Sequence, residues 1–180
     1  FGRFQPGPEV PTLNPPVPTL ERRESRIIYD QVPNARIAYS WAVPGLNDAS
    51  NAPLTVGAEV LGGLLSSRLD NILVRQEQLA VSVRAVMQSF ENASLFEVRA
   101  DVKAGVDPDL VARRMDEILA DYIADGPTED EVARVATDTA ADRISGLDYL
   151  ASKASELAEG ELYSDDPAFY KTSLEALAKV

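Results

Sequence analysis

The chain has 180 residues and a formal net charge of −12, and it contains neither histidine nor cysteine. The two absences remove the commonest general base, the commonest zinc ligand and the thiolate nucleophile. The acidity argues against a nucleic-acid footprint and against binding to anionic lipid, because both need a basic surface. The length suits a single globular domain, and no apolar run approaches the ~20 residues of a membrane span.

Proline dominates the first 20 residues. It fixes the backbone angle φ and removes hydrogen-bond donors, so residues 1–25 are predicted to form an extended, proline-rich interdomain linker. A proline-rich ligand for another protein is the weaker alternative. The chain opens with Phe1-Gly2-Arg3 rather than with an initiator methionine, so we expect a piece of a longer protein. The prolines are Pro6, Pro8, Pro11, Pro15, Pro16 and Pro18.

An ordered domain is predicted from residue 26 to residue 180. Residues 26–30 are a short strand candidate, and Pro33-Asn34 marks a turn. A half-buried strand follows and ends at Pro44-Gly45, because its apolar residues alternate with small or polar ones. These apolar residues are Ile37, Tyr39, Trp41 and Val43.

Two helices are predicted next. The first begins near residues 48–51, tolerates Pro53 in its first turn and is weakened at its end by Gly62-Gly63. The side chain of Ser66 or Ser67 is expected to cap the second helix. The apolar positions are Val56, Val60, Leu61 and Leu64 in the first helix and Leu69, Ile72 and Leu73 in the second.

A hairpin of two strands follows, with its loop at residues 91–93. One face of the first strand is predicted to carry Leu79, Val81, Val83, Ala85 and Met87. One face of the second carries Phe96, Val98, Ala100 and Val102, and charged residues lie on the other face. Such alternation indicates a sheet with one wet face, which is typical of antiparallel pairing.

Helix signals dominate the rest of the chain. Asp107 caps and Pro108 begins a helix that ends at Gly126-Pro127, and Thr128 with Glu131 forms a capping box for the next one. The buried positions are Val111, Met115, Ile118, Leu119, Tyr122 and Ile123 in the first of these helices and Val132, Val135 and Ala136 in the second. Gly146 and Gly160 indicate breaks. Asp166-Pro167 starts a last helix that carries Phe169, Leu174 and Leu177. This order predicts an α+β fold, a mostly antiparallel sheet with helices packed on one face.

The motifs that could carry chemistry are weak. Ser66-Ser67-Arg68 could be a nucleophile or an anion site, but the chain has no histidine and no Ser-x-x-Lys spacing to activate a serine, so a helix cap beside an inter-element arginine is favoured. The remaining candidates are the acids Glu129, Asp130, Glu131, Asp165 and Asp166, the glycines Gly57, Gly62 and Gly63, and the aromatic pair Tyr39 and Trp41. The acids suit helix starts, the glycines match no phosphate loop, and the aromatic pair suits the core. We predict no catalytic, cofactor-binding or metal-ligating residue in this chain.

A set of segments, taken in order, resembles the zinc metallopeptidases of the pitrilysin, insulysin and mitochondrial processing peptidase type. They are Phe1-Gly2 with Pro6-Gly7-Pro8, Val32 to Ile37, Trp41-Ala42-Val43-Pro44, Val60-Leu61-Gly62-Gly63, Ser66-Ser67-Arg68-Leu69, Leu73-Val74, Leu79 to Val83, Gly126-Pro127-Thr128 with Glu131, and Leu157-Ala158 through Asp166-Pro167. Each motif alone is short, and the ordered set spans nearly the whole chain. The resemblance implies the second, non-catalytic domain of one peptidase half, with a processing-peptidase-like metallohydrolase fold.

The resemblance also implies partners. Two halves of such an enzyme close around a peptide, and zinc is held by His-x-x-Glu-His in the domain before this one. The implied partners are that preceding catalytic domain, the second peptidase half and a peptide substrate, with no nucleic acid and no membrane. The family's domain continues past the position of Val180, so a strand edge could be left unprotected, and we expect weak homo-oligomerisation. A bacterial periplasmic or cytoplasmic location is expected, with the periplasm favoured.

Two alternatives stay open at this point. One keeps the fold without the chemistry, as an inactive peptidase-like scaffold or regulatory subunit. The other is an unrelated α+β protein-interaction domain. Within the peptidase interpretation, the acidity of the chain suggests a chamber that attracts basic peptides.

Overall fold

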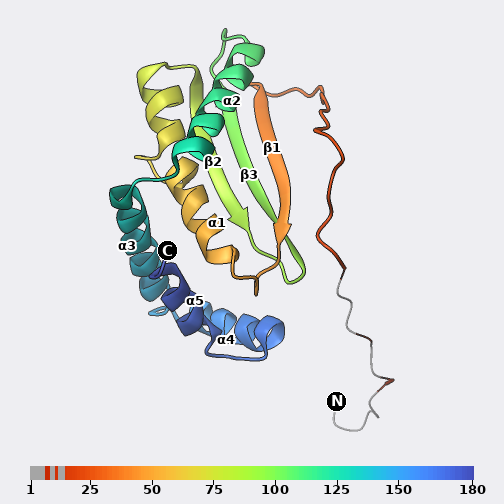
Figure 1. Ribbon diagram of the computed structural model, residues 1–180, viewed down its shortest axis with the longest axis vertical. Coiled ribbons are helices and arrows are strands. Elements are labelled where there is room, and N and C mark those ends of the chain that lie inside the picture. Colours follow the sequence, from red (N-terminus) through yellow and green to blue (C-terminus); the bar gives the residue numbers. More distant parts are fainter. Residues whose placement is uncertain (1–6, 9–10, 12–14) are drawn as a thin grey trace.

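The computed structural model describes residues 7–8, 11 and 15–180 (Figure 1). Phe1-Gly2, Pro6 and other parts of the predicted linker lie outside the described residues, so the domain division at residue 25 stays a prediction. Residues 15–35 contain no helix or strand. Arg23 nevertheless contacts the folded part, because its guanidinium lies 4.6 Å from the ring centre of Tyr39 and pairs with Asp116 at 3.3 Å.

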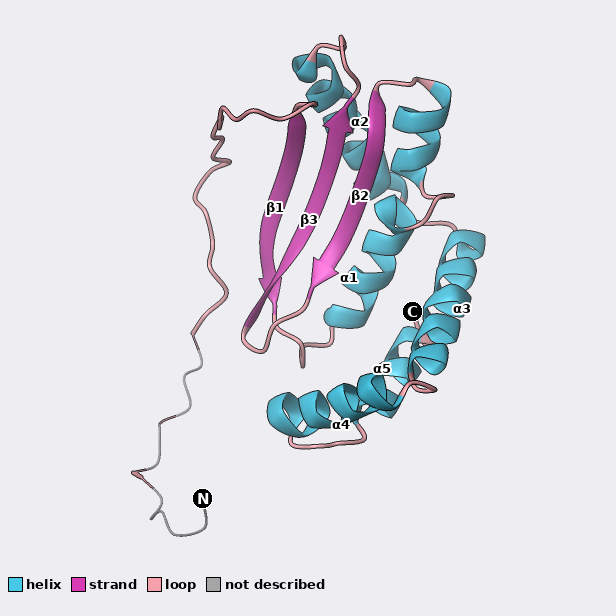
Figure 2. Cartoon of the chain, turned by 180° about the vertical axis from the view of Figure 1, so that it is seen from behind, coloured by secondary structure: helices cyan, strands magenta, loops and turns pink. Residues whose placement is uncertain are grey.

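The sheet has three antiparallel strands in the order β1-β3-β2 (Figure 2). They are β1 (Arg36–Pro44), β2 (Ala80–Gln88) and β3 (Ala93–Val102). The predicted strand at residues 26–30 is wrong. Residues with strand-forming side chains form a strand only where another strand pairs with them. This segment pairs with none of the described strands, and Ile27 and Ile28 are 79% and 87% exposed.

A bulge in β2 changes which residues face the core. Ala80 pairs with Val102 and Ser82 pairs with Asp101, so Val81 is the extra residue. Ala80 is therefore buried, whereas Val81 is 49% exposed. The prediction that Val81 shares a face with Val83 and Ala85 was wrong, because one extra residue moves the residues before it to the other face of the strand.

Helical segments cover one face of the sheet and leave the other bare (Figures 1 and 2). They are α1 (Asn51–Ala58), which continues into the π-helical η1 (Glu59–Gly63), then η2 (Asp70–Gln76) and α2 (Pro108–Asp125). This confirms the predicted α+β fold. The main core forms between the two layers and comprises Ala58, Leu61, Leu69, Leu73, Ala80, Ala85, Val98, Ala100, Val102, Val111, Met115 and Ile118.

The two ends of α2 follow the predicted signals. The Asp107 side chain accepts a hydrogen bond from the Asp109 N–H at 3.0 Å, and Gly126 ends the helix with φ of 70°. The predicted stripe is wrong at Ile123, which is 81% exposed. At about 100° per residue, Ile123 lies about 140° around the helix from the buried Ile118.

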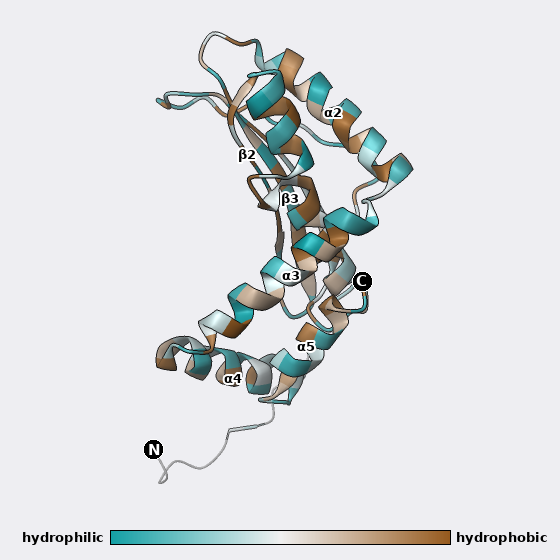
Figure 3. Ribbon diagram, turned by 90° about the vertical axis from the view of Figure 1, so that its left-hand side faces the viewer, coloured by the Kyte–Doolittle hydropathy of each residue, from teal (hydrophilic) through white to brown (hydrophobic). Residues whose placement is uncertain are grey.

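Three further helices extend away from the sheet (Figure 3). They are α3 (Glu129–Gly146), α4 (Leu150–Ser164) and α5 (Phe169–Leu177). A small second core of Val56, Val60, Val135 and Leu177 joins them to α1 and η1. The predicted break at Gly160 is wrong, because α4 runs through this residue. Gly160 is buried, and a Cβ atom there would lie 2.5 Å from the Asp166 carbonyl oxygen. The close approach explains the glycine. None of the described helices is long and apolar enough to cross a membrane.

Candidate functional site

The segment Ser66-Ser67-Arg68 contains no activated nucleophile. Ser66 is exposed, while Ser67 is buried and its Oγ has no hydrogen-bond partner in the described part of the chain. The predicted side-chain cap is therefore wrong, because the Ser67 hydroxyl is enclosed where it lines a small cavity with Val60 and Val135. A buried hydroxyl without a base to accept its proton cannot act as a nucleophile.

Arg68 is the centre of the best-formed polar cluster in the described residues. Its Nε donates to Glu131 Oε1 at 2.9 Å, and its Nη2 donates to Glu131 Oε2 at 2.7 Å and to the Gly126 carbonyl at 2.8 Å. The guanidinium lies 5.1 Å from the ring centre of Tyr122, whose hydroxyl donates to the Gly57 carbonyl at 3.1 Å. Arg68 thus links the turn before η2 to the junction between α2 and α3.

Glu131 also completes the predicted capping box. Its carboxylate accepts from the Thr128 N–H at 2.8 Å, and its own N–H donates to Thr128 Oγ1 at 3.3 Å. The hydrogen bonds from Arg68 lower the pKa of Glu131 to about 2, with a further contribution from Thr128 and against the opposing effect of desolvation. The carboxylate is fully committed to these partners. Its role is therefore to hold the junction rather than to transfer a proton.

The other acidic candidates lie at the ends of helices. Asp166 accepts a hydrogen bond from the Ala168 N–H at 2.8 Å, and Asp165 ends α4 with φ of 51°. Burial raises the pKa of Glu59, and the charge of Arg84 opposes that effect. Across residues 7–8, 11 and 15–180, no three acidic residues gather in a way that could hold a metal ion.

The glycine and aromatic candidates have packing roles. A Cβ atom on Gly62 would lie 2.6 Å from the Ala85 nitrogen, so Gly62 permits η1 to pack against β2. Tyr39 donates to the Ala112 carbonyl at 3.2 Å and packs against the main core, as predicted. Trp41 meets Tyr39 edge-on at 6.1 Å but is 45% exposed, so it lies at the margin of the core.

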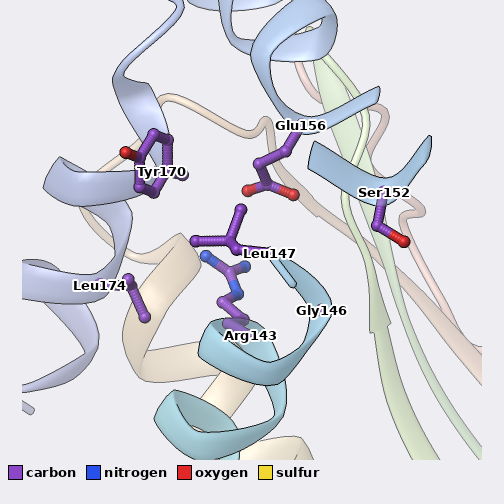
Figure 4. Close-up of a pocket in the computed structure, with 7 residues that line it drawn as sticks. All are labelled: Arg143, Gly146, Leu147, Ser152, Glu156, Tyr170 and Leu174. Carbon is purple, nitrogen blue, oxygen red and sulfur yellow. The ribbon is translucent and has the colours of Figure 1, made fainter. Parts of the chain in front are cut away.

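A cavity of about 110 Å³ lies where α3, α4 and α5 meet (Figure 4). Arg143 and Glu156 approach it from different helices, with Leu147 between them. Arg143 donates to Ser173 Oγ at 2.7 Å, which ties α3 to α5. The cavity is lined by one cation, one carboxylate, the hydroxyl side chains of Ser152 and Tyr170, and apolar groups. The sequence has no histidine that could activate one of these hydroxyls as a nucleophile.

The bare face of the sheet is the remaining candidate surface. Ala38, Ser40, Ala42 and Leu95 lie on it, beside the charged residues of β2 and β3. Arg36 pairs there with Asp101 at 2.6 Å, and Arg99 lies 3.6 Å from Glu97. The face is thus a mixture of small, apolar and largely paired charged groups. The sequence signal for it was the period-two alternation, whereas the Arg68–Glu131 pair joins positions 63 residues apart and no local pattern predicts it.

Comparison with known proteins places these features in a family. Residues 1–138 match the family described as the peptidase M16 inactive domain. A protease from Helicobacter pylori is similar in structure, with a TM-score of 0.76 at 20% identity over 84% of this chain and 37% of its own. The inactive peptidase domain of a candidate zinc protease from Bordetella parapertussis gives a TM-score of 0.73 at 16% identity over 84% of this chain and 81% of its own.

A peptidase M16 inactive domain from Pseudomonas fluorescens gives a TM-score of 0.70 at 15% identity over 81% of this chain and 34% of its own. No curated protein matches the sequence. The present chain spans just over a third of the Helicobacter pylori protease. The structural likeness establishes the fold, and the match over residues 1–138 shows that the chain belongs to the family of the peptidase M16 inactive domain, the non-catalytic domain that the sequence predicted.

Proposed function

We propose that this chain is the second, non-catalytic domain of one half of a zinc peptidase, and that the bare face of its sheet lines the peptide chamber of the parent protein. The observation that carries the proposal is the family match together with a sheet that helices cover on a single face. Hydrolysis would be performed by a catalytic domain elsewhere in the parent. This domain would complete the wall against which the peptide is held.

Zinc does not fit the residues of this chain. Zinc sites in proteins use histidine nitrogen and cysteine sulfur, with carboxylates in supporting positions. The sequence contains no histidine and no cysteine, and the described residues bring no three acidic groups together. We therefore assign zinc binding to the preceding domain of the parent and no chemical step to this one.

The bare face gives little support to a preference for basic peptides. Its charged residues are three arginines and two acids, by register Arg36, Arg84, Arg99, Glu97 and Asp101. Two of the arginines have a carboxylate within 4 Å. The net charge of −12 therefore comes from other surfaces. Small and apolar side chains beside paired charges suit contact with peptides of varied sequence.

The test is peptide hydrolysis by the parent protein carrying Leu95→Glu on the bare face. A chamber wall that contacts substrate predicts a rise in KM of about tenfold with kcat changed less than about twofold, because binding rather than chemistry is affected. Ile123→Glu is the matched control, since Ile123 is exposed on α2, which covers the other face of the sheet. Equal KM values for the two variants would contradict the proposal.

Two further measurements separate the alternatives. Calorimetric titration of the chain with zinc is expected to show no stoichiometric binding, and tight binding would overturn the non-catalytic assignment. A parent that hydrolyses no peptide but still requires this domain for assembly would favour the scaffold. The periplasmic or cytoplasmic location stays a prediction, which fractionation of the source cell would test.

A further inference from the structure

Two arginines lie directly opposite each other on the bare face of the sheet. Arg84 of β2 is paired in register with Arg99 of β3. Side chains at such positions start about 5 Å apart at their Cβ atoms and point to the same face of the sheet. Like charges in this arrangement repel each other, so the pair opposes the pairing of the two strands. An anion bound between the two guanidinium groups would replace that repulsion with attraction.

The acids of the bare face do not neutralise this pair. Asp101 is engaged by another arginine, because it accepts hydrogen bonds from Nε and Nη2 of Arg36 at 2.6 and 3.2 Å. Glu97 has one contact with Arg99, at 3.6 Å, which is longer than a hydrogen bond. Arg84 has no carboxylate oxygen within 4 Å in the described part of the chain. The pair therefore keeps hydrogen-bond donors for a ligand.

One acid of the helical layer lies near Arg84 without pairing with it. Burial raises the pKa of Glu59 of η1, and the charge of Arg84 opposes this effect, yet no ion pair within 4 Å joins the two described side chains. Arg84 is exposed, and Ala38, which lies opposite Arg99 on the β1 side, is small and exposed as well. The two guanidinium groups are thus open to a ligand that approaches the bare face.

The chemistry of the pair suits a carboxylate. A guanidinium group presents its N–H donors in a planar fork that matches the two oxygens of a carboxylate, and it stays charged throughout the physiological pH range. Two forks whose side chains start about 5 Å apart can both reach one carboxylate, one at each oxygen. Peptides carry this group on aspartate and glutamate side chains and at the C-terminus.

We propose that Arg84 and Arg99 together bind a carboxylate of the peptide held in the chamber. The inference rests on the proposed function, because it takes the bare face to be the chamber wall. The net charge of −12 repels acidic peptides at long range, but salt screens such effects beyond about 10 Å, whereas the arginines act by direct contact. The site therefore predicts a preference for acidic peptides, opposite to the one that the overall charge suggests.

The test measures peptide binding to the parent protein by fluorescence anisotropy, with phenanthroline present to chelate metal and prevent hydrolysis. The probes are peptides with a neutral dye at the N-terminus and an amide at the C-terminus, which carry one aspartate or one asparagine at each position in turn. At one position or more, the aspartate peptide should bind about fivefold more tightly than its asparagine counterpart. An asparagine peptide with a free C-terminus tests the terminal carboxylate in the same way.

Two variants assign this preference to the arginine pair. Arg84→Gln should reduce it to less than about twofold, and Arg99→Gln should act in the same direction. Arg84→Gln also removes a cross-strand repulsion, so its midpoint temperature of unfolding should not fall. Arg113→Gln is the matched control, because it makes the same charge change on an exposed position of α2, which covers the other face of the sheet. Equal preferences in Arg84→Gln and Arg113→Gln, or no preference for a carboxylate in the unchanged protein, would overturn the proposal.

The amidated asparagine peptides distinguish this site from the proposed function, because they carry no carboxylate. Leu95→Glu should weaken their binding if the bare face is a chamber wall, whereas Arg84→Gln should leave it unchanged. Weaker binding in Leu95→Glu without any change of preference in Arg84→Gln would support the chamber wall and contradict the carboxylate site. Binding that responds to neither substitution would contradict both.

Discussion

The sheet layer and the helices α3 to α5 are built in different ways. In the sheet layer, strands and helices interlock around twelve buried residues, and most of the large ones are fully enclosed. The helices α3 to α5 contribute two residues, Val135 and Leu177, to the small second core. Leucines along α4 face solvent, with Leu150 85% and Leu162 69% exposed. The sheet layer is stabilised by its own core, whereas the helices α3 to α5 depend on a few attachment points.

The difference predicts a hierarchy of stability. Regions with few buried apolar contacts open at lower free energy than the main core. The attachment points of α3 to α5 are the Arg68–Glu131 pair, the contacts of Val135 and Leu177 with α1 and η1, and the hydrogen bonds that join Asn47 to Tyr163 and Ser164. Hydrogen exchange should therefore be faster in α3 to α5 than in β3, and substitutions should act on one region or on both according to where they lie.

The largest effect is expected at the main core. Leu73 has no exposed surface and packs between η2 and the sheet. Leu73→Ala should lower the free energy of unfolding by about 2–5 kcal/mol, because the lost apolar contacts leave a cavity. Denaturant titration measures this change. Leu162→Ala is the control, and because Leu162 is mostly exposed its effect should stay within about 0.5 kcal/mol. Equal effects would remove the distinction between the two regions.

A smaller but selective effect is expected at the Arg68–Glu131 pair. Its side chains are only 23% and 19% exposed, so loss of the carboxylate leaves a partly buried charge without its partner. Glu131→Gln should lower stability by about 2–3 kcal/mol at neutral pH. The loss should appear as faster hydrogen exchange in α3 to α5, with β3 still protected. Uniform loss across both regions would contradict the role of the pair as an attachment point.

The same pair predicts an acid response. The pKa of Glu131 falls from 4.5 to about 2 in the folded chain, so its contribution to stability is present above pH 4.5 and is lost as the pH falls toward 2. Arg36 likewise lowers the pKa of Asp101, so both regions lose stability in acid. Between pH 6 and pH 2, the midpoint temperature of thermal unfolding should fall less in Glu131→Gln than in the unchanged protein. Parallel curves would show that Glu131 does not contribute.

Much of the fold follows from local sequence. Alternation predicted β1 and β3, and the capping residues Asp107 and Thr128 fixed where α2 and α3 begin. The errors lie where a partner distant in the chain decides. Val81 is displaced by a bulge that only pairing with β3 reveals, and residues 26–30 have strand-forming side chains but no paired edge.

The candidate site divides in the same way. The lack of histidine and cysteine limits the chemistry of the chain directly from composition, and the assignment of no catalytic or metal-binding residue stays a prediction. The Arg68–Glu131 pair could not be predicted, because the arginine follows a glycine-rich turn and the carboxylate belongs to a capping box 63 residues later. The sequence predicted the capping role of Glu131 and missed its second partner.

The smallest expected effect is at Gly160, where two opposing contributions can be separated. Alanine within a helix is favoured over glycine by about 1 kcal/mol. A Cβ atom here would meet the Asp166 carbonyl oxygen at 2.5 Å, so the turn from α4 to α5 must move. Overpacking of this kind costs about 1–3 kcal/mol, so Gly160→Ala should destabilise by a net of about 0–2 kcal/mol, confined to α4 and α5. Gly146→Ala is the control, since no atom lies within 4 Å of a Cβ there. Stabilisation by both substitutions would show that the turn between α4 and α5 moves at little cost and that close packing at Gly160 does not hold it.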